Sequence, residues 1–144
     1  MSLDGEYEVD NLFARIARHE VPAARVFEDD ETLAFMDAFP QSRGHVLVVH
    51  KTAPARNLLD IEPPALKALV LTVQRVARAV RAALEPDGLL VSQFNGATAG
   101  QTIFHLHFHI IPRWQGVALG RHAGGAMADP QELADLAGRI ASRL

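Results

Sequence analysis

The 144-residue chain contains no cysteine, which excludes disulfide bonds and a thiol nucleophile. It also has no apolar run close to the ~20 residues of a membrane span. Residues 1–10 are too polar and acidic for a secretory signal, so we expect a cytoplasmic protein that does not enter a membrane. A formal net charge of -3 provides no basic surface for nucleic acid. The length and a hydrophobic content of 49% favour one compact domain over residues 1–144.

The pattern of apolar residues predicts an α+β fold with an antiparallel sheet, one long helix and a C-terminal helix. Apolar residues, Val70 among them, recur at three- and four-residue steps from Leu66 to Leu84, which predicts the long helix. Asp129, Pro130 and Glu132 are typical of a helix start. The expected elements are a short helix that begins at Asp10 and ends at Val21-Pro22, strands at 25–28, 32–37 and 45–49, the long helix, strands at 89–94 and 104–111, and the final helix.

Residues 105–109 read His-Leu-His-Phe-His and place three of the seven histidines in strict alternation. Because successive side chains of a strand point to opposite faces, His105, His107 and His109 are expected on one face, about 6.6 Å apart. A strand rarely gives one whole face to imidazoles, whose ring nitrogens all need hydrogen-bond partners. The pattern therefore indicates a chemical surface.

The segment before this strand, residues 95–102, is small and polar and contains two glycines. Glycine allows the backbone to approach a ligand closely, and consecutive free N–H groups form an anion-binding nest. An ordinary connecting loop is the alternative. Directly before three aligned histidines, the segment is typical of a phosphate-binding loop.

These residues resemble the signature of the histidine triad (HIT) superfamily, which is His-x-His-x-His preceded by Gly-Gln-[Ser/Thr]. Here the signature reads Gly100, Gln101, Thr102 and then the three histidines. Upstream, residues 27–37 and the Gly-His-x-Leu-Val-x-x-Lys strand at 44–51 also resemble the family. The resemblance spans roughly residues 11–114, with 115–144 as a C-terminal loop and helix, and it implies a HIT-like fold.

The resemblance also implies a role for each histidine of the motif. Neutral imidazole is a good nucleophile near neutral pH. The family's nucleophile is the middle histidine, here His107, and it forms a phosphohistidine-type bond. His109 would contact the phosphate, His105 would orient His107, and His45 would extend the hydrogen-bond network. His19, His50 and His122 have no such pattern and receive no function.

The remaining site residues are also implied by the resemblance. The group expected at the phosphate comprises Gly100, Gln101 and Thr102, with Asn95 at the ribose–phosphate region. Asp37 would bind both ribose hydroxyls, since a carboxylate accepts two hydrogen bonds at once; a plain loop acid at a strand end is the alternative. The apolar walls around the base would be Phe13, Ile16, Val21, Phe35 and Ala38, and a role in the core accounts for each of these equally well.

Two departures from the family pattern carry information. Many bacterial relatives have a Cys-x-x-Cys pair that helps to hold structural zinc, but here those positions are Asn11 and Ala14, so no metal site is expected there. The glutamine that marks the nucleotidyltransferase branch is absent, because position 109 is histidine. This favours hydrolysis over transfer.

The sequence is most similar to the branch that hydrolyses purine nucleoside phosphoramidates, so we expect AMP derivatives as substrates and no cofactor. The open alternatives are a dinucleoside polyphosphate hydrolase, a protein that binds a metal through the three histidines, and a nucleotide-binding regulator with little turnover. Small and apolar residues in excess on the long helix, including Ala68, Ala79 and Ala82, predict a homodimer, as does the resemblance.

Overall fold

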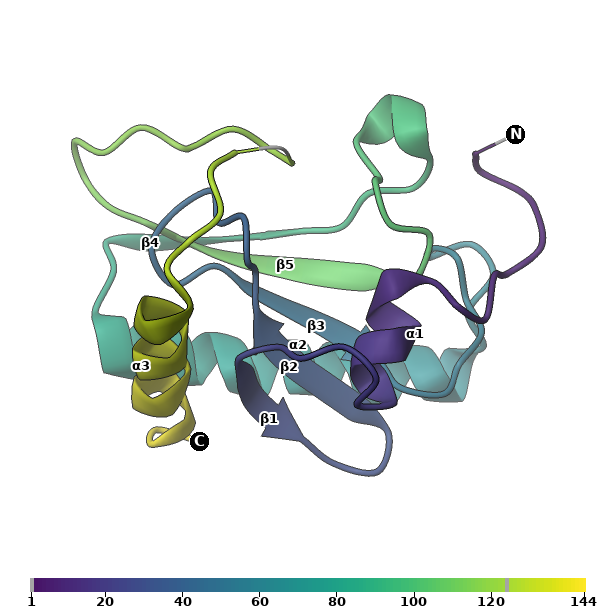
Figure 1. Cartoon of the computed structure of the whole chain (residues 1–144), viewed down its shortest axis with the longest axis horizontal. Helices are drawn as coiled ribbons and strands as arrows, with labels where there is room; N and C mark the ends of the chain where they lie inside the picture. The colour runs from purple at the N-terminus through teal and green to yellow at the C-terminus, as the bar shows by residue number, and fades with distance from the viewer. Residues whose placement is uncertain (1, 124) are drawn as a thin grey trace.

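The computed structural model describes residues 2–123 and 125–144 of the chain. A sheet forms its centre; the long helix α2 runs behind it and the short helix α1 lies on the viewer's side (Figure 1). The elements in chain order are α1 Leu12–Ala17, β1 Arg25–Glu28, β2 Thr32–Met36, β3 Val46–His50, α2 Pro63–Leu84, β4 Gly88–Ser92, the short 3₁₀ helix η1 Ala97–Ala99, β5 His107–Arg113 and α3 Pro130–Ala141.

The five strands pair antiparallel throughout, in the order β1-β2-β3-β5-β4. The central pair is β3 and β5, in which Leu47 lies opposite His109 and Val49 opposite His107. Both strands therefore have a partner on each side, which holds the histidines at the most constrained part of the sheet. The α+β fold with an antiparallel sheet is as predicted.

The two faces of the sheet have different cores. One face, here called the helical face, packs against α2; its side chains include Ala34, Met36, Val46, Val48, Phe108 and Ile110. The other, here called the histidine face, packs against α1; its side chains are Leu33, Phe35, Leu47, Val49, His107 and His109. Helix α3 contacts α2, β1 and β2 and belongs to the core of the helical face.

Helix boundaries differ from the expected ones in two places. The side chain of Asn11, not of Asp10, accepts the N–H of Ala14 and caps α1. The helix ends at Ala17, before Val21-Pro22, because His19 adopts a left-handed conformation with φ 63°. Asp129 does cap α3, as its side chain accepts the N–H of Gln131.

Helix α2 is longer than predicted and begins at Pro63, in the first turn, where proline is tolerated. Its buried stripe excludes Val70, which is 44% exposed, and includes Val76 at 0%. Among the described residues, no helix combines the length and the apolar character needed to cross a bilayer.

Strand β5 begins at His107, so His105 lies before the strand. The prediction that His105 belongs to the strand is therefore wrong. The predicted strand at 104–111 is shifted to His107–Arg113. Phe104 and His105 belong to a bend, and their backbone does not pair with a neighbouring strand. His105 is therefore oriented by its own hydrogen bonds rather than by strand alternation.

Candidate active site

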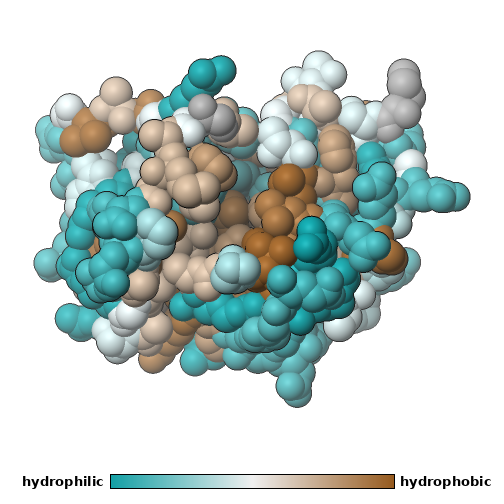
Figure 2. Space-filling view, viewed as in Figure 1, coloured by the Kyte–Doolittle hydropathy of each residue, from teal (hydrophilic) through white to brown (hydrophobic). Residues whose placement is uncertain are grey.

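The histidine face is not completely covered, and a cavity of about 700 Å³ opens on it between α1 and α3. Figure 2 shows hydrophobic surface gathered at the centre of this face with hydrophilic surface around it. Nine of the predicted site residues line the cavity: Phe13, Ile16, Phe35, Asp37, Ala38, His45, Thr102, His107 and His109.

His107 has one nitrogen fixed and one free. Its Nδ1 lies 2.7 Å from the carbonyl oxygen of His105. Since a carbonyl only accepts, Nδ1 carries the proton, and in the neutral ring Nε2 is left with a lone pair. The edge of the ring packs on Phe13, with the ring centres 4.9 Å apart. This is the tautomer that a nucleophilic Nε2 requires.

His105 uses both of its nitrogens in hydrogen bonds. Nε2 donates to the carbonyl oxygen of His50 at 2.8 Å, so Nδ1 accepts from the hydroxyl of Tyr7 at 2.6 Å. The ring is 1% exposed and does not line the cavity. These two hydrogen bonds hold the His105 ring, and the carbonyl of the same residue accepts from His107; the orienting role of His105 stays a prediction.

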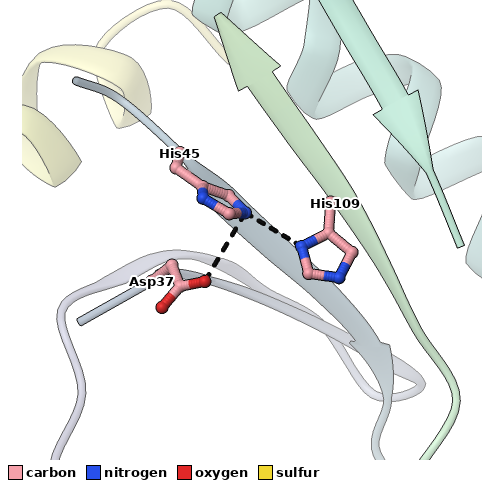
Figure 3. Close-up of side chains that lie close together, drawn as sticks. All are labelled: Asp37, His45 and His109. Atoms are coloured by element: carbon pink, nitrogen blue, oxygen red, sulfur yellow. Dashed lines mark hydrogen bonds and ion pairs between the residues drawn. The ribbon is translucent and has the colours of Figure 1, made fainter. Parts of the chain in front are cut away.

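His45, which directly precedes β3, and His109 of β5 form a second pair (Figure 3). The backbone N–H of Gln41 donates to Nδ1 of His45 at 3.0 Å, so the proton of His45 lies on Nε2. Nε2 donates to Nδ1 of His109 at 2.9 Å. The proton of His109 is thereby placed on Nε2, a buried atom with no partner in the described part of the chain.

Burial keeps these four rings neutral. It lowers the pKa of His45, His105 and His107 to about 4. Burial lowers the pKa of His109 to about 3, and the neighbouring rings of His107 and His45 add to the effect. At neutral pH, Nε2 of His107 is therefore unprotonated, while Nε2 of His109 presents an N–H. An unprotonated nitrogen of His107, which can act as a nucleophile, and an N–H donor of His109 thus lie on neighbouring rings, whose centres are 5.0 Å apart.

Asp37 follows β2 directly and faces the same pair. One carboxylate oxygen accepts the N–H of Phe39 at 2.8 Å, and the other lies 3.5 Å from Nε2 of His45 (Figure 3). Burial raises the pKa of this carboxyl above its usual range. The side chain borders the cavity, so its oxygens can accept hydrogen bonds from hydroxyl groups of a ligand; the contact with a ribose stays a prediction.

The hydrogen bonds of His105, His107 and His109 do not fit a metal held by all three rings. Three of their six ring nitrogens face carbonyl oxygens or a hydroxyl within the protein, and two of these three are both nitrogens of His105. Asp37, His45 and His109 do offer ligand atoms within 4.8 Å of one another. Two imidazoles and a carboxylate suit Zn²⁺. An ion there would have to replace the proton between His45 and His109.

Most of the bonded N–H groups in the loop at 95–102 donate within the loop, and that of Ala97 donates to the hydroxyl of Ser2. The N–H groups of Ala99, Gly100 and Gln101 donate to loop carbonyls, and that of Gly96 donates to the side chain of Gln101. The expected anion nest is therefore not formed by these N–H groups. The left-handed φ of 112° at Gly100 instead closes a compact turn that ends at Thr102 on the cavity wall.

Besides His105, four predicted residues do not line the cavity. The amide of Gln101 bonds to Gly96, Arg56 and Ile103, while the side chain of Asn95 accepts from Leu58 and Gln93. Gly100 lies in the turn, and Val21 packs against the apolar cluster around Phe13. Direct ligand contacts for these four stay predictions.

Two residues of the site were missed by sequence reasoning. Tyr7 reaches His105 from the N-terminal segment, and a lone tyrosine among acidic residues gives no signal of this. His122 lines the cavity from the segment after β5, where its ring centre lies 5.6 Å from that of His109. Its only sequence signal was a position in a glycine-rich loop downstream of the triad.

Comparison with known proteins places this geometry in a family. The HIT domain matches residues 18–116. A Hit-like protein from Bartonella henselae, described as involved in cell-cycle regulation, has a crystal structure with a TM-score of 0.88 and 43% identity, over 96% of this chain and 99% of that one.

Two curated proteins extend the comparison. Protein hit of Bacillus subtilis is 36% identical over 138 residues, which are 92% of this chain and 93% of that protein. Adenylylsulfatase HINT3 of Arabidopsis thaliana is 36% identical over 79% of this chain and 60% of its own length. With the triad, its fixed tautomers and these relatives together, the chain belongs to the HIT domain family of the histidine triad superfamily.

Proposed function

We propose that this protein is a nucleotide-binding hydrolase that cleaves purine nucleoside phosphoramidates through a nucleotidyl-histidine intermediate. One observation carries the proposal: Nδ1 of His107 donates to the carbonyl of His105, which leaves an unprotonated Nε2 at the cavity. Members of the family are generally nucleotide hydrolases or transferases, which supports this class of reaction.

The substrate would occupy the cavity in three parts. Phe13, Ile16 and Phe35 offer an apolar wall to the base, and Asp37 offers two acceptors to the ribose hydroxyls. The phosphate would lie at His107 and His109. The volume of about 700 Å³ leaves space for a leaving group beyond the nucleotide.

The reaction would proceed in two balanced steps. Nε2 of His107 attacks phosphorus and forms a P–N bond, while the bond from phosphorus to the amine breaks and the amine nitrogen takes a proton from solvent. The Nε2–H of His109 donates a hydrogen bond to a phosphate oxygen, where charge develops in the transition state. Water then attacks phosphorus, gives one proton back to solvent, releases AMP and returns the electron pair of the P–N bond to Nε2 of His107.

A panel of leaving groups tests the proposal. The Arabidopsis relative is named for the cleavage of adenylyl sulfate, which also carries an adenylyl group, so the panel includes that compound. We expect the highest kcat/KM for an adenosine phosphoramidate and lower values for adenylyl sulfate and diadenosine polyphosphates. Intact-mass detection of one adenylyl group on the protein would support the intermediate. AMP binding without turnover of any compound would instead favour a nucleotide-binding regulator.

We also propose that the active protein is a cytoplasmic homodimer. Ala79 is 2% exposed within the core of its own chain, so the excess apolar surface lies elsewhere. Val70 and Leu71 of α2 are exposed, as are Leu90 and Val91 of β4, which is an edge strand of the sheet. A two-fold axis would pair β4 with its own copy and cover these residues. Light scattering that gives the mass of one 15.7 kDa chain at micromolar concentration would contradict this.

A further inference from the structure

The segment between β5 and α3, residues 114–123 and 125–129, is here called the C-terminal strap. It leaves the end of β5, loops over one end of the sheet and returns to α3 (Figure 1). From residue 117 onward it lies outside the part of the chain that matches the HIT domain. The match to the HIT domain therefore does not describe the contribution of the strap to the site.

Backbone hydrogen bonds tie the strap to the segment that carries Asp37. The N–H of Gly120 donates to the carbonyl of Gln41 at 2.7 Å, and that of Ala128 donates to the carbonyl of Ala38 at 2.9 Å. A Cβ at Gly120 would lie 2.7 Å from the same carbonyl oxygen of Gln41, so this close approach requires glycine. The strap is thus held against the rim of the cavity at two points.

His122 lies between these two points and faces the phosphate end of the cavity. Its Nε2 lies 2.6 Å from the carbonyl of Gly100, so Nε2 carries a proton. The ring packs on Phe94, with centres 4.8 Å apart, and approaches His109. Within the described chain, Nδ1 makes no hydrogen bond, and the half-buried ring lines the cavity together with Thr102 and His107.

The charge of the cavity shows why this position matters. No lysine or arginine is found among the described residues that line it, and the one acidic group is Asp37. The buried rings of His45, His107 and His109 are neutral at neutral pH because burial lowers each pKa. A nucleotide phosphate therefore meets no fixed positive charge on this wall, while His122 is the one lining imidazole outside the buried cluster.

We propose that His122 is a phosphate-binding residue, which the C-terminal strap holds beside the phosphoryl group as a positively charged hydrogen-bond donor. The proposal rests on the function proposed above and adds a contact to it. In the cationic form of the ring both nitrogens are donors, so Nδ1 can donate to a phosphate oxygen while Nε2 keeps its hydrogen bond to Gly100. Charge-assisted hydrogen bonds of this kind are about twice as strong as neutral ones.

Calorimetry of two ligands that differ only in the phosphate tests this contact without turnover. In His122→Gln, the amide can still donate to Gly100 but carries no charge. We expect AMP affinity to fall roughly tenfold or more, the range for a lost hydrogen bond to a charged group, while adenosine affinity changes by less than about twofold. The control is His19→Asn, which removes an exposed imidazole that does not line the cavity, and it should leave both affinities unchanged.

A strap variant provides the second measurement. Gly120→Ala pushes the strap away from Gln41 and should weaken AMP binding in the same direction as His122→Gln. If AMP and adenosine lose equal affinity in His122→Gln, His122 only supports the fold of the strap and the proposal fails. Unchanged AMP affinity in His122→Gln also overturns it. If the wild-type protein does not bind AMP at all, the proposed function itself is wrong.

Discussion

The helical face and the histidine face are built from alternate residues of the same strands. In β5, Phe108 and Ile110 point to α2, while His107 and His109 point to the cavity. The helical face is aliphatic and closed, as Val46, Val48 and Ile110 have no exposed surface. The histidine face leaves a cavity and carries polar rings. Because side chains alternate between the two faces of a strand, neighbouring residues of β5 contribute either to the closed core or to the candidate site.

The largest expected effect on this contrast comes from His107→Ala. Turnover should fall on the order of 10⁴-fold or more, as for the loss of other covalent nucleophiles. The unfolding midpoint in urea should stay close to that of the wild type, because the ring borders the cavity rather than the closed core. Substantial residual turnover would show that His107 is not the nucleophile. A large loss of stability would show that the histidine face contributes to stability as well as to the reaction.

The opposite result is expected from Ile110→Ala on the helical face. Ile110 is fully buried, so its truncation should cost about 2–5 kcal/mol in the free energy of unfolding. The rate constant kcat should change by less than about threefold under conditions where the variant is folded, since the contacts that are lost lie on the face of the sheet opposite the cavity. A kcat that falls in proportion to the free energy of unfolding would contradict the view that the helical face contributes to stability and not to the reaction.

Asp37→Ala tests the ribose end of the histidine face. If the carboxylate binds two hydroxyls, AMP binding should weaken by roughly 1.5–3 kcal/mol, the range for hydrogen bonds to charged groups. The 2′,3′-dideoxy form of AMP should lose much less, and calorimetry of both ligands on both proteins closes the cycle. Equal losses would mean that Asp37 acts on folding or on the base.

The histidine face should also make stability depend on pH, and the helical face should not. His45, His105, His107 and His109 have a lower pKa in the folded protein than the ~6.5 of an unfolded chain. Below that value the unfolded chain binds more protons, so the free energy of unfolding should fall from about pH 6.5 to about pH 4. Urea titrations should show a shallower fall in His109→Gln and an unchanged one in Ile110→Ala.

We expect the smallest effect on activity from the removal of metal ions with a chelator. In the proposed mechanism the imidazole of His107 attacks directly, so activity should survive exhaustive treatment with EDTA. The informative variant is Asp37→Ala, which removes a ligand from the set of Asp37, His45 and His109. Loss of activity on chelation, restored by Zn²⁺ in the wild type but not in this variant, would favour a metal role for that set.

The elements and the buried histidines were predictable because they follow local patterns. The alternation of His107 and His109 in β5, the three- and four-residue steps of α2 and the cap at Asp129 each reflect neighbours in the sequence. The resemblance then supplied Asp37, which lines the same cavity as His107 and His109.

The rest of the site depends on contacts between distant residues. Tyr7 and His105 are 98 positions apart, and His122 meets a carbonyl 22 positions away. The tautomers of His105 and His109 follow from such distant partners, so no sequence pattern reveals them. Asn11 caps α1 in place of the predicted Asp10. Both residue types are favoured at the N-cap, so N-cap propensity alone does not decide between two adjacent candidates.

The pairing of β3 with β5 also has a consequence for how the protein folds. Helix α2 and strand β4 lie between these strands in the sequence, so their contact closes a long loop and carries a high entropic cost. Hairpin β2–β3 and helix α2 are local and can form earlier. His45 and His109, 64 positions apart, meet only when the long loop closes. A folding intermediate that lacks this step would contain every residue of the site and still be unable to bind or cleave a nucleotide.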